Sequence, residues 1–169
     1  MSQTPEALFA GSPLPPSPLA REQIAGLSGK EILEGLLSGA LPAPPFGPTT
    51  NIAPAEIGEG RVVFIGRAGA GFLNPMGIIH GGWIATILDT AMGCAVHSTL
   101  KAGQTYTTTS MTVNYVRPLT ENSAIVRCEA VAVYTGARTA TSEGKLFDER
   151  GRLVAHGSET CMIMSPSKE

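Results

Sequence analysis

The chain has 169 residues and a net charge of −2, with 12 Lys and Arg against 14 Asp and Glu. This length suits one domain with a real core, and the absence of basic runs and aromatic ladders argues against nucleic-acid binding. All apolar stretches are shorter than the roughly 20 residues of a membrane span, and the N-terminus lacks the features of a secretory signal. We therefore expect a soluble, cytoplasmic protein without a nucleic-acid or membrane partner.

The N-terminal third of the chain differs in pattern from the rest. Residues 1–27 are rich in Pro and Ser and lack periodicity, so we expect a partly mobile extension. Ser28 and Glu31 form a capping box, and the apolar residues after them predict a short helix of about ten residues. Prolines then predict an irregular connection, so that helix and connection together make up residues 28–59.

Residues 60–164 carry the pattern of one α+β domain, and 165–169 form a tail. The segment "RVVFIGRA" predicts a strand, and apolar residues at helical spacing predict a long helix from Gly81 to about Leu100. Four strand-like runs follow the helix, and the short turn-prone pieces between them predict an antiparallel meander. The apolar stripe of the helix consists of Ile84, Ile87, Leu88, Ala91 and Ala95.

Asp89 is the only carboxylate in this helix. At about 100° per residue it shares a line with Gly82 and Gly93, displaced by about 160° from the apolar stripe. A solvent-facing side would carry long polar residues, so small residues here indicate a covered face, with sheet on one side of the helix and a second subunit on the other. Desolvation would then raise the pKa of Asp89 towards that of a working base; the alternative is a purely structural hydrogen-bond acceptor.

The start of the helix suits the binding of a polarised carbonyl group. His80, Gly81 and Gly82 lie where N–H groups are unpaired and the helix dipole is positive, and glycine permits close approach of a ligand. One such N–H donor can stabilise a transition state by about 3 to 4 kcal/mol. Asn74 offers a second donor from the preceding loop, or is an ordinary Asn-Pro turn residue.

The segments "NPMGIIHGG", "WIATILD", "VNYVRP" and "GARTATSEGKLFDERGRLVAHGS" together resemble the hotdog-fold acyl-CoA thioesterases, in particular the phenylacetate-degradation, or PaaI-like, branch. The specific features are an Asn six residues before the His of His-Gly-Gly, an acid nine residues after it and an aromatic-x-Arg-Pro strand end. The resemblance implies a hotdog fold, in which an antiparallel sheet wraps a long central helix, here with an extra N-terminal helix. It also implies a homo-oligomer whose sites lie at a dimer interface, and we expect a tetramer.

The resemblance implies a catalytic role for five residues. Asp89 matches the family's catalytic carboxylate, which acts as general base or as nucleophile. Gly81 matches the backbone donor that polarises the thioester carbonyl, and Asn74 matches its side-chain helper. His80 matches the histidine that lines the reacting centre. Thr108 matches the hydroxyl residue on the strand after the helix, which orients the acid or its water.

Gly82, Arg117 and Arg138 are the predicted substrate-binding residues. The two arginines match positions where the family often has basic residues near the nucleotide, and arginine suits phosphate, although each is equally consistent with an exposed strand-end charge. Coenzyme A enters as part of the substrate, so no cofactor is expected. The three cysteines are over thirty residues apart and no His pair has ligand spacing, so no metal site is expected either.

The predicted reaction is hydrolysis of an acyl-CoA to a free acid and coenzyme A. One alternative is an acyl-CoA-binding sensor or scaffold without turnover, which would not need Asp89. A second alternative is an enoyl-CoA hydratase with the same fold. It ranks lower because the hydratases resemble one another in an Asn-Pro-x-His loop, whereas three residues separate Asn-Pro from Ile79-His80 here. Aryl and medium-chain acyl groups both fit the sequence.

Overall fold

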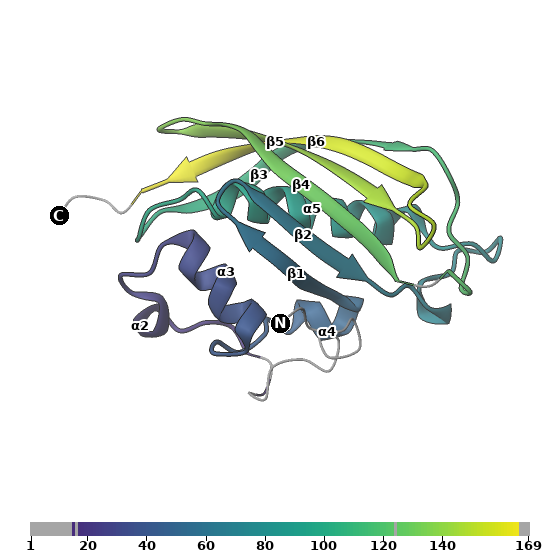
Figure 1. The fold of residues 1–169 in the computed structure, drawn as a ribbon, viewed down its shortest axis with the longest axis horizontal. Coiled ribbons are helices and arrows are strands. Elements are labelled where there is room, and N and C mark those ends of the chain that lie inside the picture. Colours follow the sequence, from purple (N-terminus) through teal and green to yellow (C-terminus); the bar gives the residue numbers. More distant parts are fainter. Residues whose placement is uncertain (1–14, 16, 124, 166–169) are drawn as a thin grey trace.

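The computed structural model describes residues 15, 17–123 and 125–165. Six antiparallel strands form one sheet that curves over the long helix α5, Gly81–His97 (Figure 1). The strand order is β1-β2-β4-β5-β6-β3. The expected α+β hotdog fold is confirmed. The strands are β1 Ile52–Gly58, β2 Arg61–Gly66, β3 Thr105–Tyr115, β4 Val126–Thr135, β5 Thr139–Phe147 and β6 Leu153–Met164.

The apolar stripe of α5 forms the centre of the core, as its helical spacing predicts. Ile87, Leu88 and Ala91 are completely buried against the sheet. Trp83 is buried beside them, and its Nε1–H donates a 2.8 Å hydrogen bond to the carbonyl oxygen of Thr50. Burial of these side chains is the main favourable contribution to folding, because each large apolar side chain removed from water contributes about 1.5 to 3 kcal/mol.

The extra N-terminal helix is also present, as α3, Gly29–Ser38. Its capping box has both expected bonds, since Ser28 Oγ accepts from the Glu31 N–H and the Glu31 carboxylate accepts from the Ser28 N–H. Two short helices, α2 Arg21–Ile24 and α4 Phe46–Thr50, precede and follow it, and all three lie on the side of β1 in Figure 1. Most of the predicted N-terminal extension, residues 1–14 and 16, and most of the predicted tail, residues 166–169, lie outside the described residues.

The irregular connection expected before residue 60 contains a strand. β1 pairs antiparallel with β2, and the hairpin turns at Gly60, whose φ of +69° suits glycine. The proline at position 54 obscures the strand pattern, because it cannot donate to a sheet ladder. The sheet tolerates Pro54 because β1 is an edge strand with an irregular register at this residue.

The predicted four-strand meander is wrong at its first link. β4, β5 and β6 follow one another in the sheet, but β3 pairs with β6 and lies at the sheet edge. The segment between Tyr115 and Val126 is a crossing connection and not a hairpin turn. Buried Leu119 anchors it beneath the start of α5, where its carbonyl oxygen accepts from the Ile79 N–H. The polar residues after it do form a turn, in which the Ser123 N–H donates to the Thr120 carbonyl oxygen, but this turn does not pair β3 with β4.

The face of α5 with the small residues is covered, although partly by a different element from the one expected. We expected a second subunit there, but β3 of the same chain lies over the Asp89 and Gly93 positions. A Cβ atom on Gly93 would lie 2.6 Å from the Tyr106 hydroxyl oxygen. Glycine at position 93 therefore permits the close approach of β3 to this face of the helix.

Candidate active site

Asp89 and Thr108 meet between α5 and β3. Asp89 is half-buried, and the Thr108 hydroxyl lies 3.4 Å from Asp89 Oδ1 as a hydrogen-bond donor. Strand alternation turns Thr108 towards the helix, whereas the side chains of Thr107 and Thr109 are exposed. The structure therefore brings these two predicted site residues together.

A bulge in β3 fixes the position of Thr108. The register with β6 shifts between Thr108 and Ser110, and the hydroxyl of the intervening Thr109 donates to the Thr160 carbonyl oxygen at 3.0 Å. A bulge inserts one extra residue, so the side-chain alternation changes phase at this point. Thr108 before the bulge and Met111 after it can both face the helix.

The surroundings of Asp89 raise its pKa. Burial is the largest cause, and the hydrogen bond from Thr108 opposes it by favouring the charged form. No cationic side chain in the described part of the chain forms an ion pair with Asp89. A carboxylate with a raised pKa is a stronger proton acceptor than an exposed aspartate, which suits a general base.

The start of α5 presents one unused backbone donor. His80 is the N-cap residue; its Nδ1 accepts from the Gly82 N–H at 2.8 Å and its carbonyl oxygen accepts from the Trp83 N–H at 3.0 Å. Within the described residues the Gly81 N–H has no acceptor. Tyr115 closes the other side of Gly81, because its hydroxyl donates to the Gly81 carbonyl oxygen at 3.1 Å. The Gly81 N–H is thus available to a carbonyl group.

Asn74 organises the loop before the helix. Its side-chain oxygen accepts from the N–H groups of Met76 at 2.9 Å and Ile78 at 3.3 Å. This is the turn role that an Asn-Pro sequence favours. Since Asn74 Oδ1 already accepts two hydrogen bonds, Nδ2 is the side-chain group that can interact with a ligand, as a donor. The turn role and the predicted donor role are therefore compatible.

The two groups of predicted residues lie apart within one chain. Gly81 and Asp89 are eight positions apart, and at about 1.5 Å per residue their Cα atoms are about 12 Å apart along the helix. One group contains Asn74, His80, Gly81 and Gly82; the other contains Asp89 and Thr108. A thioester carbonyl held at Gly81 is out of reach of Asp89 in the same subunit.

The two predicted substrate-binding arginines also lie far apart. Arg117 is anchored at the beginning of β6, where its Nη1 donates to the Leu153 carbonyl oxygen. Arg138 is exposed, and its carbonyl oxygen accepts from the Ile163 N–H near the end of β6. The intervening stretch of β6, from Leu153 to Ile163, spans about 34 Å at about 3.4 Å per residue. One chain therefore does not bring the two guanidinium groups to the same phosphate.

Glu159 belongs to the site but was missed in the sequence. It is 2% exposed on β6, and its Oε1 lies 2.8 Å from the Thr108 hydroxyl and 3.0 Å from Cys161 Sγ. Burial, followed by the charge of Asp89, raises the pKa of Glu159 against the effect of these hydrogen bonds. The sequence does contain a signal for it: Glu159 is two residues before Cys161 and four before Ile163, and such alternation predicts that all three side chains face the same side of the sheet.

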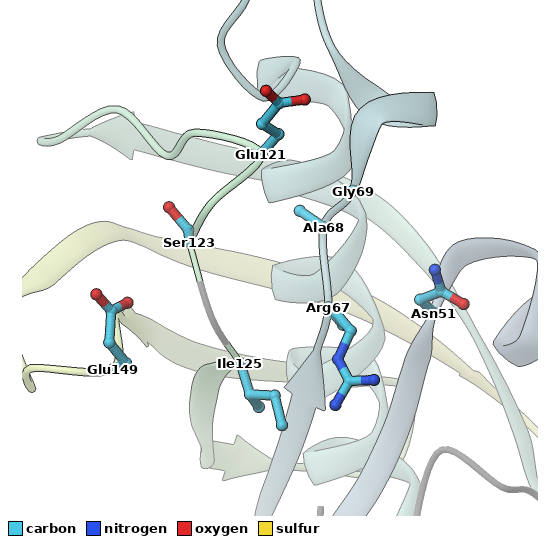
Figure 2. A pocket seen from close by; sticks show the side chains of 8 residues that line it. All are labelled: Asn51, Arg67, Ala68, Gly69, Glu121, Ser123, Ile125 and Glu149. Carbon is cyan, nitrogen blue, oxygen red and sulfur yellow. The ribbon is translucent and has the colours of Figure 1, made fainter. Parts of the chain in front are cut away.

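A separate open cavity of about 520 Å³ lies near the end of β2 (Figure 2). None of the predicted site residues lines it. Arg67 follows β2, and Glu121 and Ser123 belong to the crossing connection between β3 and β4.

Among the described residues no group of three His, Cys, Asp or Glu side chains could hold a metal ion. No helix in residues 15, 17–123 and 125–165 is long and apolar enough to cross a membrane.

Comparison with known proteins identifies the class. A family model described as the thioesterase superfamily matches residues 76–155. A protein from Thermus thermophilus is 30% identical, over 70% of this chain and 96% of its own, with a TM-score of 0.64. A point mutant of the phenylacetic acid degradation protein PaaI from the same organism is 29% identical, over 70% of this chain and 97% of its own, with a TM-score of 0.64.

A third solved structure extends the match over more of the chain. A phenylacetic acid degradation-related protein from Ralstonia eutropha is 26% identical, over 77% of this chain and 98% of its own, with a TM-score of 0.70. The search of curated proteins found no match. The chain belongs to the thioesterase superfamily. Within it, the chain is a hotdog-fold, PaaI-like thioesterase, an enzyme that hydrolyses thioesters.

Proposed function

We propose that this enzyme hydrolyses an acyl-CoA thioester to a free carboxylic acid and coenzyme A, with Asp89 as the group that activates or performs the attack. The observation that carries the proposal is the contact of Thr108 Oγ1 with Asp89 Oδ1 at 3.4 Å, on a helix face otherwise made of small residues. A half-buried carboxylate with a raised pKa and one oriented oxygen suits this task.

The chemical steps follow from the two groups of residues. The Gly81 N–H, helped by Asn74 Nδ2, donates to the thioester carbonyl oxygen as it gains negative charge, and His80 lines the same centre. Asp89 takes a proton from water while the water oxygen bonds to the carbonyl carbon. The tetrahedral intermediate then breaks its C–S bond, and the coenzyme A thiolate takes the proton from Asp89.

Direct attack by Asp89 is the second route to the same products. The carboxylate would displace the thiolate and form an anhydride, which water then hydrolyses. A single turnover in ¹⁸O-labelled water distinguishes water activation from an anhydride that is hydrolysed at its Asp89 carbonyl. Water activation puts the label in the product acid, whereas hydrolysis at the Asp89 carbonyl of an anhydride leaves it on the protein.

Each site would combine two subunits. Reacting atoms must come within about 3 to 3.5 Å, which the separation of Gly81 and Asp89 along one helix does not allow. We therefore assign Asn74, His80 and Gly81 of one subunit and Asp89 and Thr108 of a second subunit to each site. Among the described strands β3 is at the end of the sheet order, so its outer edge can pair with a second copy. The dimer would be the catalytic unit, and a tetramer a pair of such dimers.

The remaining assignments concern the substrate and the setting of the enzyme. Gly82 would allow the thioester to approach the helix start, and Arg117 and Arg138 would contact coenzyme A from different subunits. Hydrolysis by this route needs only water and the carboxylate, so no cofactor is proposed. We place the enzyme in the cytoplasm, without a nucleic-acid or membrane partner.

Release of free thiol from a panel of short-chain, long-chain and aryl acyl-CoA substrates tests the proposal. We expect hydrolysis of at least one class, and loss of it in Asp89→Asn with an unchanged circular dichroism spectrum. Glu143→Gln is the control, because Glu143 is exposed on the outer face of β5. Tight acyl-CoA binding without thiol release would support a sensor instead, and hydration of an enoyl-CoA would support a hydratase.

A further inference from the structure

Thr108 lies between two acidic side chains from different elements. Its hydroxyl oxygen is 2.8 Å from Glu159 Oε1 on β6 and 3.4 Å from Asp89 Oδ1 on α5. A threonine hydroxyl has one proton to donate, and an ionised carboxylate only accepts. If both carboxyl groups were ionised, only one of the two contacts would be a hydrogen bond. A proton on one carboxyl group allows both.

The surroundings favour Glu159 as the group that carries this proton. Glu159 is 2% exposed, its Oε2 has no hydrogen-bond partner among the described residues, and Asp89 is the more exposed of the two. An ionised carboxylate buried without a cation is much more costly than a neutral acid. Within the described ranges, every titratable group that faces Glu159 is neutral or acidic. These groups are Asp89 and Cys94 on α5, Tyr106 on β3 and Cys161 on β6.

We propose that Glu159 is a positioning residue that holds a proton and directs the Thr108 hydroxyl to Asp89. The Glu159 O–H donates to Thr108 Oγ1, and the Thr108 O–H donates to Asp89 Oδ1. Asp89 then remains the single ionised carboxylate, with one oxygen oriented and the other free to act. The inference rests on the proposed function of Asp89, on which Glu159 acts through Thr108.

The direction of these bonds depends on the protonation of Glu159. Once Glu159 loses its proton, it is the nearer of two charged acceptors and takes the Thr108 proton. Asp89 then loses its donor and faces a second negative charge. Activity should therefore fall on the alkaline side of its pH optimum, as Glu159 ionises, for a reason that is independent of the substrate.

Two substitutions of similar size separate positioning from packing. Glu159→Gln keeps a donor towards Thr108 at every pH, and Glu159→Met has none. In Glu159→Met nothing directs the Thr108 hydroxyl to Asp89. We expect kcat to fall about tenfold, which is the rate equivalent of losing that hydrogen bond to a charged group, with a smaller change in KM. Glu159→Gln should have a higher kcat than Glu159→Met and should lack the alkaline fall of the parent. Glu143→Gln, on the outer face of the neighbouring strand, should keep that fall.

Equal kcat values in the two Glu159 variants, or an alkaline fall that persists in Glu159→Gln, would overturn the proposal. Infrared spectroscopy at neutral pH provides a measurement independent of turnover. The difference spectrum of parent minus Glu159→Gln should contain the C=O band of a protonated carboxyl group, and parent minus Asp89→Asn should not. If the band appears instead in parent minus Asp89→Asn, the proton is on Asp89 and the proposal is wrong. A parent that hydrolyses no acyl-CoA but has the Glu159 band would refute the proposed function and leave the proton on Glu159.

Discussion

His80 Nδ1 accepts a 2.8 Å hydrogen bond from the N–H of Gly82, two residues further along α5. The histidine carbonyl oxygen also accepts from the Trp83 N–H. Of the first three N–H groups of the helix, only that of Gly81 is left without a partner in the described part of the chain. A neutral His80 ring must then carry its proton on Nε2, because Nδ1 is an acceptor here. The cap thus selects one backbone donor and one imidazole tautomer together.

Gly81→Pro should remove this donor without breaking the helix. Proline is favoured at the first helical position, where its missing N–H has no helical partner, and His80 already has the extended conformation that a following proline requires, with ψ of 134°. We expect kcat to fall about 100- to 1,000-fold, as for the loss of an oxyanion donor. Steady-state kinetics and thermal unfolding would measure the two effects. Gly81→Ala retains the N–H, so a loss of equal size there would point to steric exclusion instead.

Asn74→Asp should separate the two roles of this side chain. The aspartate keeps an oxygen that accepts from Met76 and Ile78 but replaces the Nδ2 donor with a second acceptor. We expect nearly unchanged melting and a fall in kcat of about tenfold or more. Asn74→Ala loses the turn bonds as well, so both melting temperature and kcat should fall. Full activity in Asn74→Asp would reduce Asn74 to a turn residue.

Thr108→Val should leave the proposed base, Asp89, without its orienting hydrogen bond, with little change in shape. The substitution removes the hydroxyl that contacts Asp89 Oδ1, so kcat should fall about tenfold, with a smaller change in KM. Thr108→Ser restores the hydroxyl and should recover most of the rate. Thr107→Val, on the exposed face of the same strand, is the matched control. Failure of serine to restore the rate would show that the methyl group of Thr108 matters more than its hydroxyl.

The pH profile of kcat/KM should reflect the raised pKa of Asp89. A base works only when ionised, so the rate should rise with pH through an apparent pKa above the ordinary 3.8 of aspartate. Thr108→Val should move this rising limb to higher pH, because the Thr108 hydrogen bond lowers the pKa of Asp89. A rising limb at or below 3.8 would contradict the assignment of Asp89 as the base.

Glu159→Gln should change the pH dependence of folding. The pKa of Glu159 is raised in the folded state from its ordinary 4.5, so above pH 4.5 the folded chain binds more protons at this residue than the unfolded chain. Stability from this residue is therefore complete below pH 4.5 and is lost as pH rises through the folded-state pKa. Glutamine does not titrate, so the melting temperature of Glu159→Gln should rise relative to that of the parent as pH rises. A constant difference across the series would show that Glu159 ionises normally.

The elements with strong local patterns could be predicted from the sequence. The stripe of Ile84, Ile87 and Leu88 indicated the central helix, and Ser28 with Glu31 indicated the start of α3. β1 was missed because Pro54 hides its pattern, and the pairing of β3 was wrong because a polar connection resembled a hairpin turn. The second error concerns a strand partner, which depends on contacts remote in the sequence.

Short-range periodicity and motif residues were enough to predict the main helices, most strands, the spacing of His80, Gly81 and Asp89, and the resemblance to a family. The position of β3 beside β6 emerged only from the folded chain. The position of β3 places Thr108 between Asp89 and Glu159, which are 19 and 51 positions away from Thr108 in the sequence. Strand order depends on which buried faces and edges fit together across the whole chain. That long-range fit places a second carboxyl group beside the first.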